Sequence, residues 1–139
     1  MDVQYTLPPN FQAIVDRFGP PVTKPGVLFT YGNVIYYPGG RRRGPISDAI
    51  MAHEAVHARR QGDDPAGWWQ RYLTEKSFRY TEELVAHQVE YLVASEGVGR
   101  QIRRRALALI AHRLSSPLYG RMVTLDQARE AIKGECVGL

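Results

Sequence analysis

Cysteine is nearly absent from this chain of 139 residues, in which Cys136 stands alone. One cysteine cannot close a disulfide bond within the chain. Zinc and related metals also take nitrogen from His and oxygen from Asp and Glu. A metal site in this chain must therefore draw its ligands from those three residue types.

Long apolar runs are absent as well. No stretch approaches the roughly 18 apolar residues that a membrane span requires, and the chain begins Met1-Asp2-Val3-Gln4 without a basic segment that leads into an apolar run. We therefore expect no membrane partner. We expect the unmodified chain to be cytoplasmic in the cell that makes it, or to be packed into a larger assembly such as a virion.

The overall composition is that of an ordinary folded protein. Hydrophobic residues make up 44% and charged residues 23% of the chain, and its length suits one domain, so we predict a single domain over residues 1–139. Much of the net charge of +4 comes from arginines at 41–43 and within 100–105. No motif that reads nucleic acid accompanies these clusters, so nucleic-acid binding ranks below a solvated surface.

Apolar spacing, helix caps and breakers predict a mostly helical α+β fold. We predict helices over Phe11 to Phe18, from Ser47 or Asp48 to about Gln61, from Pro65 onward, over Ser77 to Ser95, over Arg100 to Leu114, and from Thr124 to Lys133. Val27 to Tyr37 predicts a strand, or a short hairpin that turns at Gly32-Asn33. Within 100–114, we expect an apolar side opposite the arginines, formed by Ile102, Leu107, Leu109, Ile110 and Leu114.

The segment His53-Glu54-Ala55-Val56-His57 is an H-E-x-x-H sequence. Residues four apart lie on one face of a helix, so both imidazoles can reach one ion. Glu54 lies about 100° round the helix from His53, which places it beside that ion. Zinc with three protein ligands keeps one position open and lowers the pKa of a water there. Glu54 is then the general base for that water.

A later helix offers the third ligand. The candidates are Glu82, Glu83, His87 and Glu90. At about 100° per residue, Glu83, His87 and Glu90 share one side of that helix, and Glu83 is the preferred ligand. The alternative is that these carboxylates lie at the surface and pair with Arg79 or other neighbours.

The two motifs together resemble those of the gluzincin division of zinc metallopeptidases. In that division a later helix carries a ligand Glu followed three residues on by a small residue, as Glu83 is followed by Ala86. The run from Phe78 to His87 is also similar to small metallopeptidase-like proteins of bacteriophages and prophages. The resemblance covers roughly residues 27 to 95. It implies a zincin-like fold with a short strand or small sheet beside the first motif, with His53, His57 and Glu83 as zinc ligands and Glu54 as catalytic base.

The same resemblance implies roles for further residues. Many gluzincins have an Asp at the position of His87, and it orients a metal-bound His; His87 would either act in that way or be a fourth ligand that closes the site. An edge strand beside the active helix would hold an extended peptide, and Thr30 to Tyr37 would play that part. The oxyanion stabiliser would be Tyr119 or, ranked lower, His112.

The favoured function is zinc-dependent hydrolysis of peptide bonds in a peptide or protein substrate. Two alternatives stay open: a zinc-stabilised structural or assembly component of a phage particle, which would contact phage structural proteins, and a basic nucleic-acid-binding protein on a zincin scaffold. Glu54 favours the enzyme, because a purely structural zinc site has no use for a carboxylate beside an open position.

Overall fold

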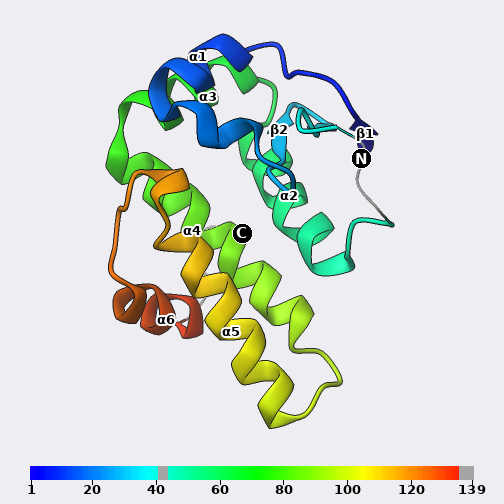
Figure 1. The fold of residues 1–139 in the computed structure, drawn as a ribbon, viewed down its shortest axis with the longest axis vertical. Coiled ribbons are helices and arrows are strands. Elements are labelled where there is room, and N and C mark those ends of the chain that lie inside the picture. Colours follow the sequence, from blue (N-terminus) through cyan, green and yellow to red (C-terminus); the bar gives the residue numbers. More distant parts are fainter. Residues whose placement is uncertain (41–43, 135–139) are drawn as a thin grey trace.

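A computed structural model describes residues 1–40 and 44–134, so that Arg41, Arg42, Arg43 and Cys136 lie outside the described residues. The elements follow in the order β1 (Asp2–Gln4), α1 (Phe11–Phe18), a 3-10 turn η1 (Pro20–Thr23), β2 (Phe29–Tyr31), β3 (Val34–Tyr36), α2 (Asp48–Gln61), α3 (Pro65–Thr74), α4 (Lys76–Ala94), α5 (Arg100–Leu114), a 3-10 turn η2 (Pro117–Tyr119) and α6 (Leu125–Lys133) (Figure 1). This order confirms the predicted fold class, α+β and mostly helical.

A small sheet lies beside α2. Its strand order is β1-β3-β2, with β3 parallel to β1 and antiparallel to β2. The second of the two predictions for this segment, a hairpin, is therefore confirmed, and Gly32 provides the turn with a φ of 61°. Sequence periodicity did not reveal β1, because three residues are too few to show a period and each pairs with a residue 32 positions further along the chain.

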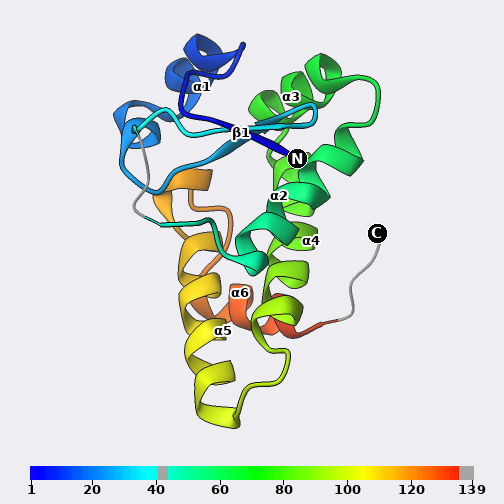
Figure 2. The same ribbon diagram turned by 90° about the vertical axis from the view of Figure 1, so that its right-hand side faces the viewer.

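Helix α4 is central in the fold. It packs against α2 on one side and against α5 and α6 on another, while α3 precedes it at the top of the molecule (Figures 1 and 2). Val56 of α2 meets Val85 and Ala86 of α4 in a fully buried contact. Because α2 and α4 face each other over most of their length, side chains from both can converge on one point.

Local capping interactions fix where the helices begin. The Ser47 hydroxyl accepts a hydrogen bond from the Ile50 amide at the start of α2, and the Asp64 carboxylate accepts one from Gly67 at the start of α3. Thr124 and Gln127 form a reciprocal capping box at the start of α6. The start of α2, which sets the direction of the first motif, therefore depends on a local signal.

The apolar side of α5 agrees with the prediction only in part. Its buried residues are Leu107, Ile110, Ala111 and Leu114, which pack against α6 and α4. Leu109 and Ile102 are instead 68% and 53% exposed. The prediction is therefore confirmed for Leu107, Ile110 and Leu114 and is wrong for Ile102 and Leu109. Leu109 lies about 200° round the helix from Leu107, on the opposite side.

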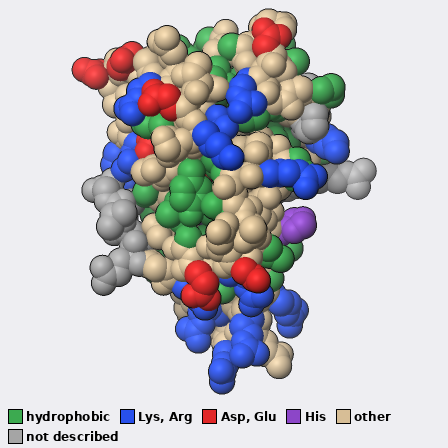
Figure 3. Space-filling view, turned by 90° about the vertical axis from the view of Figure 1, so that its left-hand side faces the viewer, with side chains coloured by type: hydrophobic (Ala, Val, Ile, Leu, Met, Phe, Trp, Pro, Cys, Tyr) green, Lys and Arg blue, Asp and Glu red, His purple; other side chains and the backbone are tan. Residues whose placement is uncertain are grey.

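Basic side chains gather at one end of the molecule, where the connection from α4 leads into α5 (Figure 3). Exposed arginines there are Arg100, Arg103, Arg104 and Arg105. Over the residues that the structure describes, none of the helices combines the length and the hydropathy that a membrane crossing needs.

Candidate metal centre

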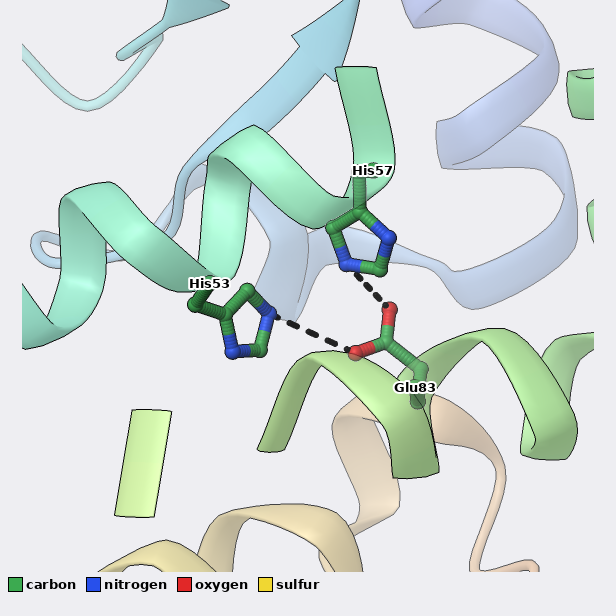
Figure 4. A group of neighbouring side chains, drawn as sticks. All are labelled: His53, His57 and Glu83. Atoms are coloured by element: carbon green, nitrogen blue, oxygen red, sulfur yellow. Dashed lines mark ion pairs between the residues drawn. The ribbon is translucent and has the colours of Figure 1, made fainter. Parts of the chain in front are cut away.

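Three buried side chains converge between α2 and α4. The one-turn spacing of His53 and His57 directs both imidazoles to the face of α2 that packs on α4, and Glu83 meets them from α4 (Figure 4). Nε2 of His53 lies 3.6 Å from Oε2 of Glu83, and Nε2 of His57 lies 3.4 Å from Oε1. One ligand atom from each residue lies within 4.8 Å of the other two, so the group could hold a metal ion.

The hydrogen bonds of Glu83 fit a bound cation. Its Oε1 accepts a hydrogen bond of 2.5 Å from the Tyr72 hydroxyl. Its Oε2 is buried and makes no hydrogen bond with any group that the structure describes. A buried carboxylate oxygen without a partner costs free energy, and a cation held by both imidazoles would satisfy it.

Glu90 orients one of the imidazoles. Its Oε1 lies 2.9 Å from Nδ1 of His53, and its carboxylate also pairs with the Arg113 guanidinium. A carboxylate on the outer nitrogen of a ligand His fixes the ring orientation and the tautomer. The resemblance implied this task as one of two possible roles of His87, but the group that contacts Nδ1 of His53 is Glu90, one turn further along α4. Glu90, one of the candidates for the third metal ligand, therefore contacts His53 and Arg113 instead.

His87 lies outside the group of ligand atoms. Its Nδ1 donates a hydrogen bond of 2.6 Å to the main-chain carbonyl of Glu83, and its Nε2 is buried without a hydrogen-bond partner among the described residues. Burial, followed by the nearby His53, lowers the pKa of His87 to about 3. The ring is therefore neutral and packs edge-on against His53 and Tyr119, at centroid distances of 4.7 and 5.6 Å. Neither predicted role, as a fourth ligand or as the orienting group, matches this geometry.

Glu82 has a structural task. Its carboxylate accepts hydrogen bonds from Trp68 Nε1 at 2.6 Å and from Arg60, which joins α2, α3 and α4. The alternative of surface carboxylates paired with Arg79 is wrong, because Glu82 and Glu83 are 2% and 3% exposed. Arg79 instead donates to the main-chain carbonyls of Tyr72 and Tyr119.

Glu54 stands beside the three ligand side chains. It is 6% exposed and lines the same cavity as His53, His57 and Glu83. The Thr30 hydroxyl of β2 donates a hydrogen bond of 2.7 Å to Oε2 of Glu54. Sequence reasoning missed this contact, since nothing in the local pattern around Thr30 signals a side-chain partner in another element.

The cavity over the centre has a volume of about 440 Å³. Most of its remaining lining is apolar or aromatic, including Phe18, Val22, Val27, Leu28, Phe29, Ile50, Trp69, Leu109 and Leu118. Both proposed oxyanion stabilisers, Tyr119 and His112, also line it. Burial, followed by the charge of Glu83, holds the pKa of Tyr119 well above its ordinary value of 10.0, so its hydroxyl remains a proton donor.

The edge of the sheet differs from the predicted one. β3 has partners on both sides, so it has no open edge, and β2 is the strand beside α2. The main-chain carbonyl of Thr30 already accepts hydrogen bonds from Gln61 and Trp69. An added peptide strand therefore cannot use β3, and at Thr30 it would compete with two side chains. The cavity meets the chain earlier, over residues 26–30.

The centre has a distinctive charge state without an ion. Burial by itself lowers the pKa of His53, but the nearby carboxylates of Glu83 and Glu90 outweigh burial and raise it to about 10. Burial raises the pKa of Glu83, but His57 and His53 outweigh it and hold that pKa well below the ordinary value. A proton on His53 therefore balances part of the carboxylate charge.

Comparison with known proteins gave no further support. No family model, curated protein or solved structure matches the chain. The function must therefore be inferred from the geometry of the centre and from its chemistry.

Proposed function

We propose that the protein is a zinc-dependent peptidase with Glu54 as general base. The observation that carries this proposal is the position of Glu54, which lines the same cavity as the three ligand side chains but supplies none of the ligand atoms. A site in which a metal served stability alone would need no carboxylate at this place. The set His53, His57 and Glu83 is also the one that the resemblance to gluzincins implies.

Zinc is the proposed metal because two imidazoles and one carboxylate form a donor set that it takes in hydrolytic sites. When bound, zinc supplies Lewis acidity, which lowers the pKa of a water molecule and polarises a carbonyl group. Glu90 holds His53 in the orientation that this donor set needs, and Tyr72 holds Glu83.

The other side chains act on protons. Glu54 accepts a proton from the attacking water and donates it to the nitrogen of the leaving amine, so that the peptide bond breaks as a carbon–oxygen bond forms. The Thr30 hydroxyl fixes the carboxylate of Glu54 through its hydrogen bond of 2.7 Å. Tyr119 retains its proton and donates a hydrogen bond to the carbonyl oxygen as negative charge develops there.

The lining of the cavity supports a peptide substrate with an apolar side chain next to the scissile bond. Val27, Leu28, Phe29 and Leu118 surround the space over the centre. Burial of an apolar side chain there removes its surface from water, at about 25 cal/mol per Å². We propose that this contact contributes much of the binding free energy for the substrate.

The test compares wild type with Glu54→Gln. Purified, zinc-loaded proteins are incubated with a diverse peptide library, cleavage is read by mass spectrometry, and zinc is measured by elemental analysis. Glu54→Gln should keep its zinc and lose cleavage by about 10²-fold or more, because an amide cannot accept the proton. Glu130→Gln makes the same chemical change at a residue on the surface of α6 and should cleave like wild type.

Two outcomes would contradict this proposal. Equal cleavage by wild type and Glu54→Gln at equal zinc content would exclude Glu54 as the base. Absence of any cleavage by zinc-loaded wild type across the library would exclude the peptidase and would favour a structural zinc site.

A further inference from the structure

The outward side of α5 carries a surface that packing does not explain. We define the α5 outer face as Ile102, Arg105 and Leu109, which follow one another along one side of the helix. Ile102 and Leu109 are 53% and 68% exposed, and Arg105 is exposed between them. The helix buries its opposite side, so this face has no role in the core.

The α5 outer face is continuous with the cavity over the metal centre. Leu109 lines that cavity together with His112 and Arg113, which lie on the same side of α5 about one turn further along. Ile102 lies two turns before Leu109, near the start of α5, where Arg100 and Arg103 to Arg105 are exposed. A chain that leaves the cavity along α5 would therefore meet Leu109, Arg105 and Ile102 in that order.

The positive charge of α5 indicates which kind of polymer would bind along it. The helix contains five arginines and no acidic residue, with the sequence RQIRRRALALIAHRL. Acidic segments are attracted to such a surface, and basic segments are repelled. Exposed Ile102 and Leu109 add apolar surface, which a peptide with apolar side chains can cover and a phosphate backbone cannot use. The combination therefore favours an acidic polypeptide over a nucleic acid.

We propose that the α5 outer face binds an acidic, partly apolar segment of the polypeptide substrate that lies a few residues beyond the scissile bond. This inference rests on the proposed peptidase function. Two helical turns separate Leu109 from Ile102 by about 10 Å, at 1.5 Å per residue. An extended peptide covers that distance in about three residues. The face is thus long enough to contact about three consecutive residues of the substrate.

The first experiment measures this preference by cleavage. Zinc-loaded wild type digests a library of peptides derived from a whole proteome, and the frequency of Asp and Glu is counted at each position around every cut. Wild type should show enrichment of acidic residues over about three consecutive positions on one side of the cut. The double variant Ile102→Ser/Arg105→Gln should lose that enrichment.

A matched double variant controls for charge and hydrophobicity in general. Arg104→Gln removes the same charge about 100° round α5, and Leu125→Ser removes an exposed leucine from α6, where it is 44% exposed. This variant should keep the acidic enrichment. If wild type cleaves peptides without the enrichment, or if Ile102→Ser/Arg105→Gln retains it, the inference is overturned while the peptidase function stands.

A binding experiment separates the two proposals if nothing is cleaved. Zinc-loaded Glu54→Gln is applied to an array of immobilised peptides of about 15 residues, with and without the Ile102→Ser/Arg105→Gln changes. Acidic, partly apolar peptides should bind about three- to tenfold more tightly when the face is intact. Equal binding, or no preference for acidic peptides, overturns the inference. Displacement of those peptides by a short DNA duplex at physiological salt would show that the face binds nucleic acid, which also overturns it.

Discussion

At the scale of single residues, the three candidate ligand side chains are held by different contacts. His53 is held by the carboxylate of Glu90 and Glu83 by the Tyr72 hydroxyl. The outer nitrogen of His57 makes no hydrogen bond within the described part of the chain, and its ring packs edge-on against Trp68 at 5.5 Å between centroids. Packing therefore holds the outer side of the His57 ring, whereas hydrogen bonds hold His53 and Glu83.

The Tyr72 contact gives a direct prediction for metal affinity. Tyr72→Phe removes the hydroxyl but keeps the ring, which stacks on Trp68. Loss of a group that orients a ligand should weaken zinc binding by about 10-fold or more. Competition against a chromophoric chelator measures the affinity. Tyr91→Phe makes the same change near the C-terminal end of α4 and should leave the zinc affinity unchanged. Equal affinities for wild type, Tyr72→Phe and Tyr91→Phe would contradict the role of Tyr72.

The charge state of the centre predicts how stability depends on pH in the metal-free protein. The pKa of His53 is raised from 6.5 to about 10, so its contribution is complete below pH 6.5 and is lost as the pH rises through 10. Although burial opposes it, contact with His53 and Arg113 lowers the pKa of Glu90 from 4.5 to about 2, so its contribution is lost as the pH falls through 2. Stability should therefore fall steadily from neutral pH towards pH 10.

Thermal melting in the presence of a chelator, over this range of pH, measures that dependence. His53→Gln removes the titrating group, so its melting temperature should vary less between neutral pH and pH 10 than that of wild type. The same alkaline slope in both proteins would show that His53 does not carry the effect.

At the scale of secondary-structure elements, the sequence predicted where helices begin better than it predicted how the helices pack against one another. A polar residue just before an apolar run predicts a helix cap. Caps of this kind are formed by Ser47, Asp64 and Thr124. The sequence also indicated which face of α2 carries His53 and His57, because that depends on spacing along one helix. The role of Glu90 depends on the packing of α4 against both α2 and α5, which no spacing along a single helix reveals.

Helix α5 shows the same limit, because Leu109 was predicted to lie on its apolar side and is exposed instead. Mutations can test this difference. Leu107 is 6% exposed and Leu109 is 68% exposed. Leu107→Ala should lower the free energy of unfolding by about 2 to 5 kcal/mol, because it leaves a cavity in the core. Leu109→Ala should change it by less than about 0.5 kcal/mol. Urea denaturation measures both, and similar losses for the two variants would restore the apolar side that the sequence predicted.

At the scale of the whole molecule, a metal at this centre would join α2 to α4, two helices that α3 separates in the chain. We expect about one zinc per chain, and we expect a chelator to lower the melting temperature, because an ion that binds the folded state at 100 times its Kd adds about 2.7 kcal/mol. His57→Ala should remove most of the effect of the chelator. His112→Ala, which changes an exposed His outside the ligand group, should retain it.

The contacts of Arg79 have a consequence for substrate binding. Arg79 is 1% exposed and donates to the main-chain carbonyls of both Tyr72, in α3, and Tyr119, in η2. One guanidinium thus joins two walls of the cavity and restricts their movement relative to each other. The conformational entropy of these walls is lost when the chain folds rather than when a substrate arrives. Binding free energy is therefore available for positioning the scissile bond over Glu54.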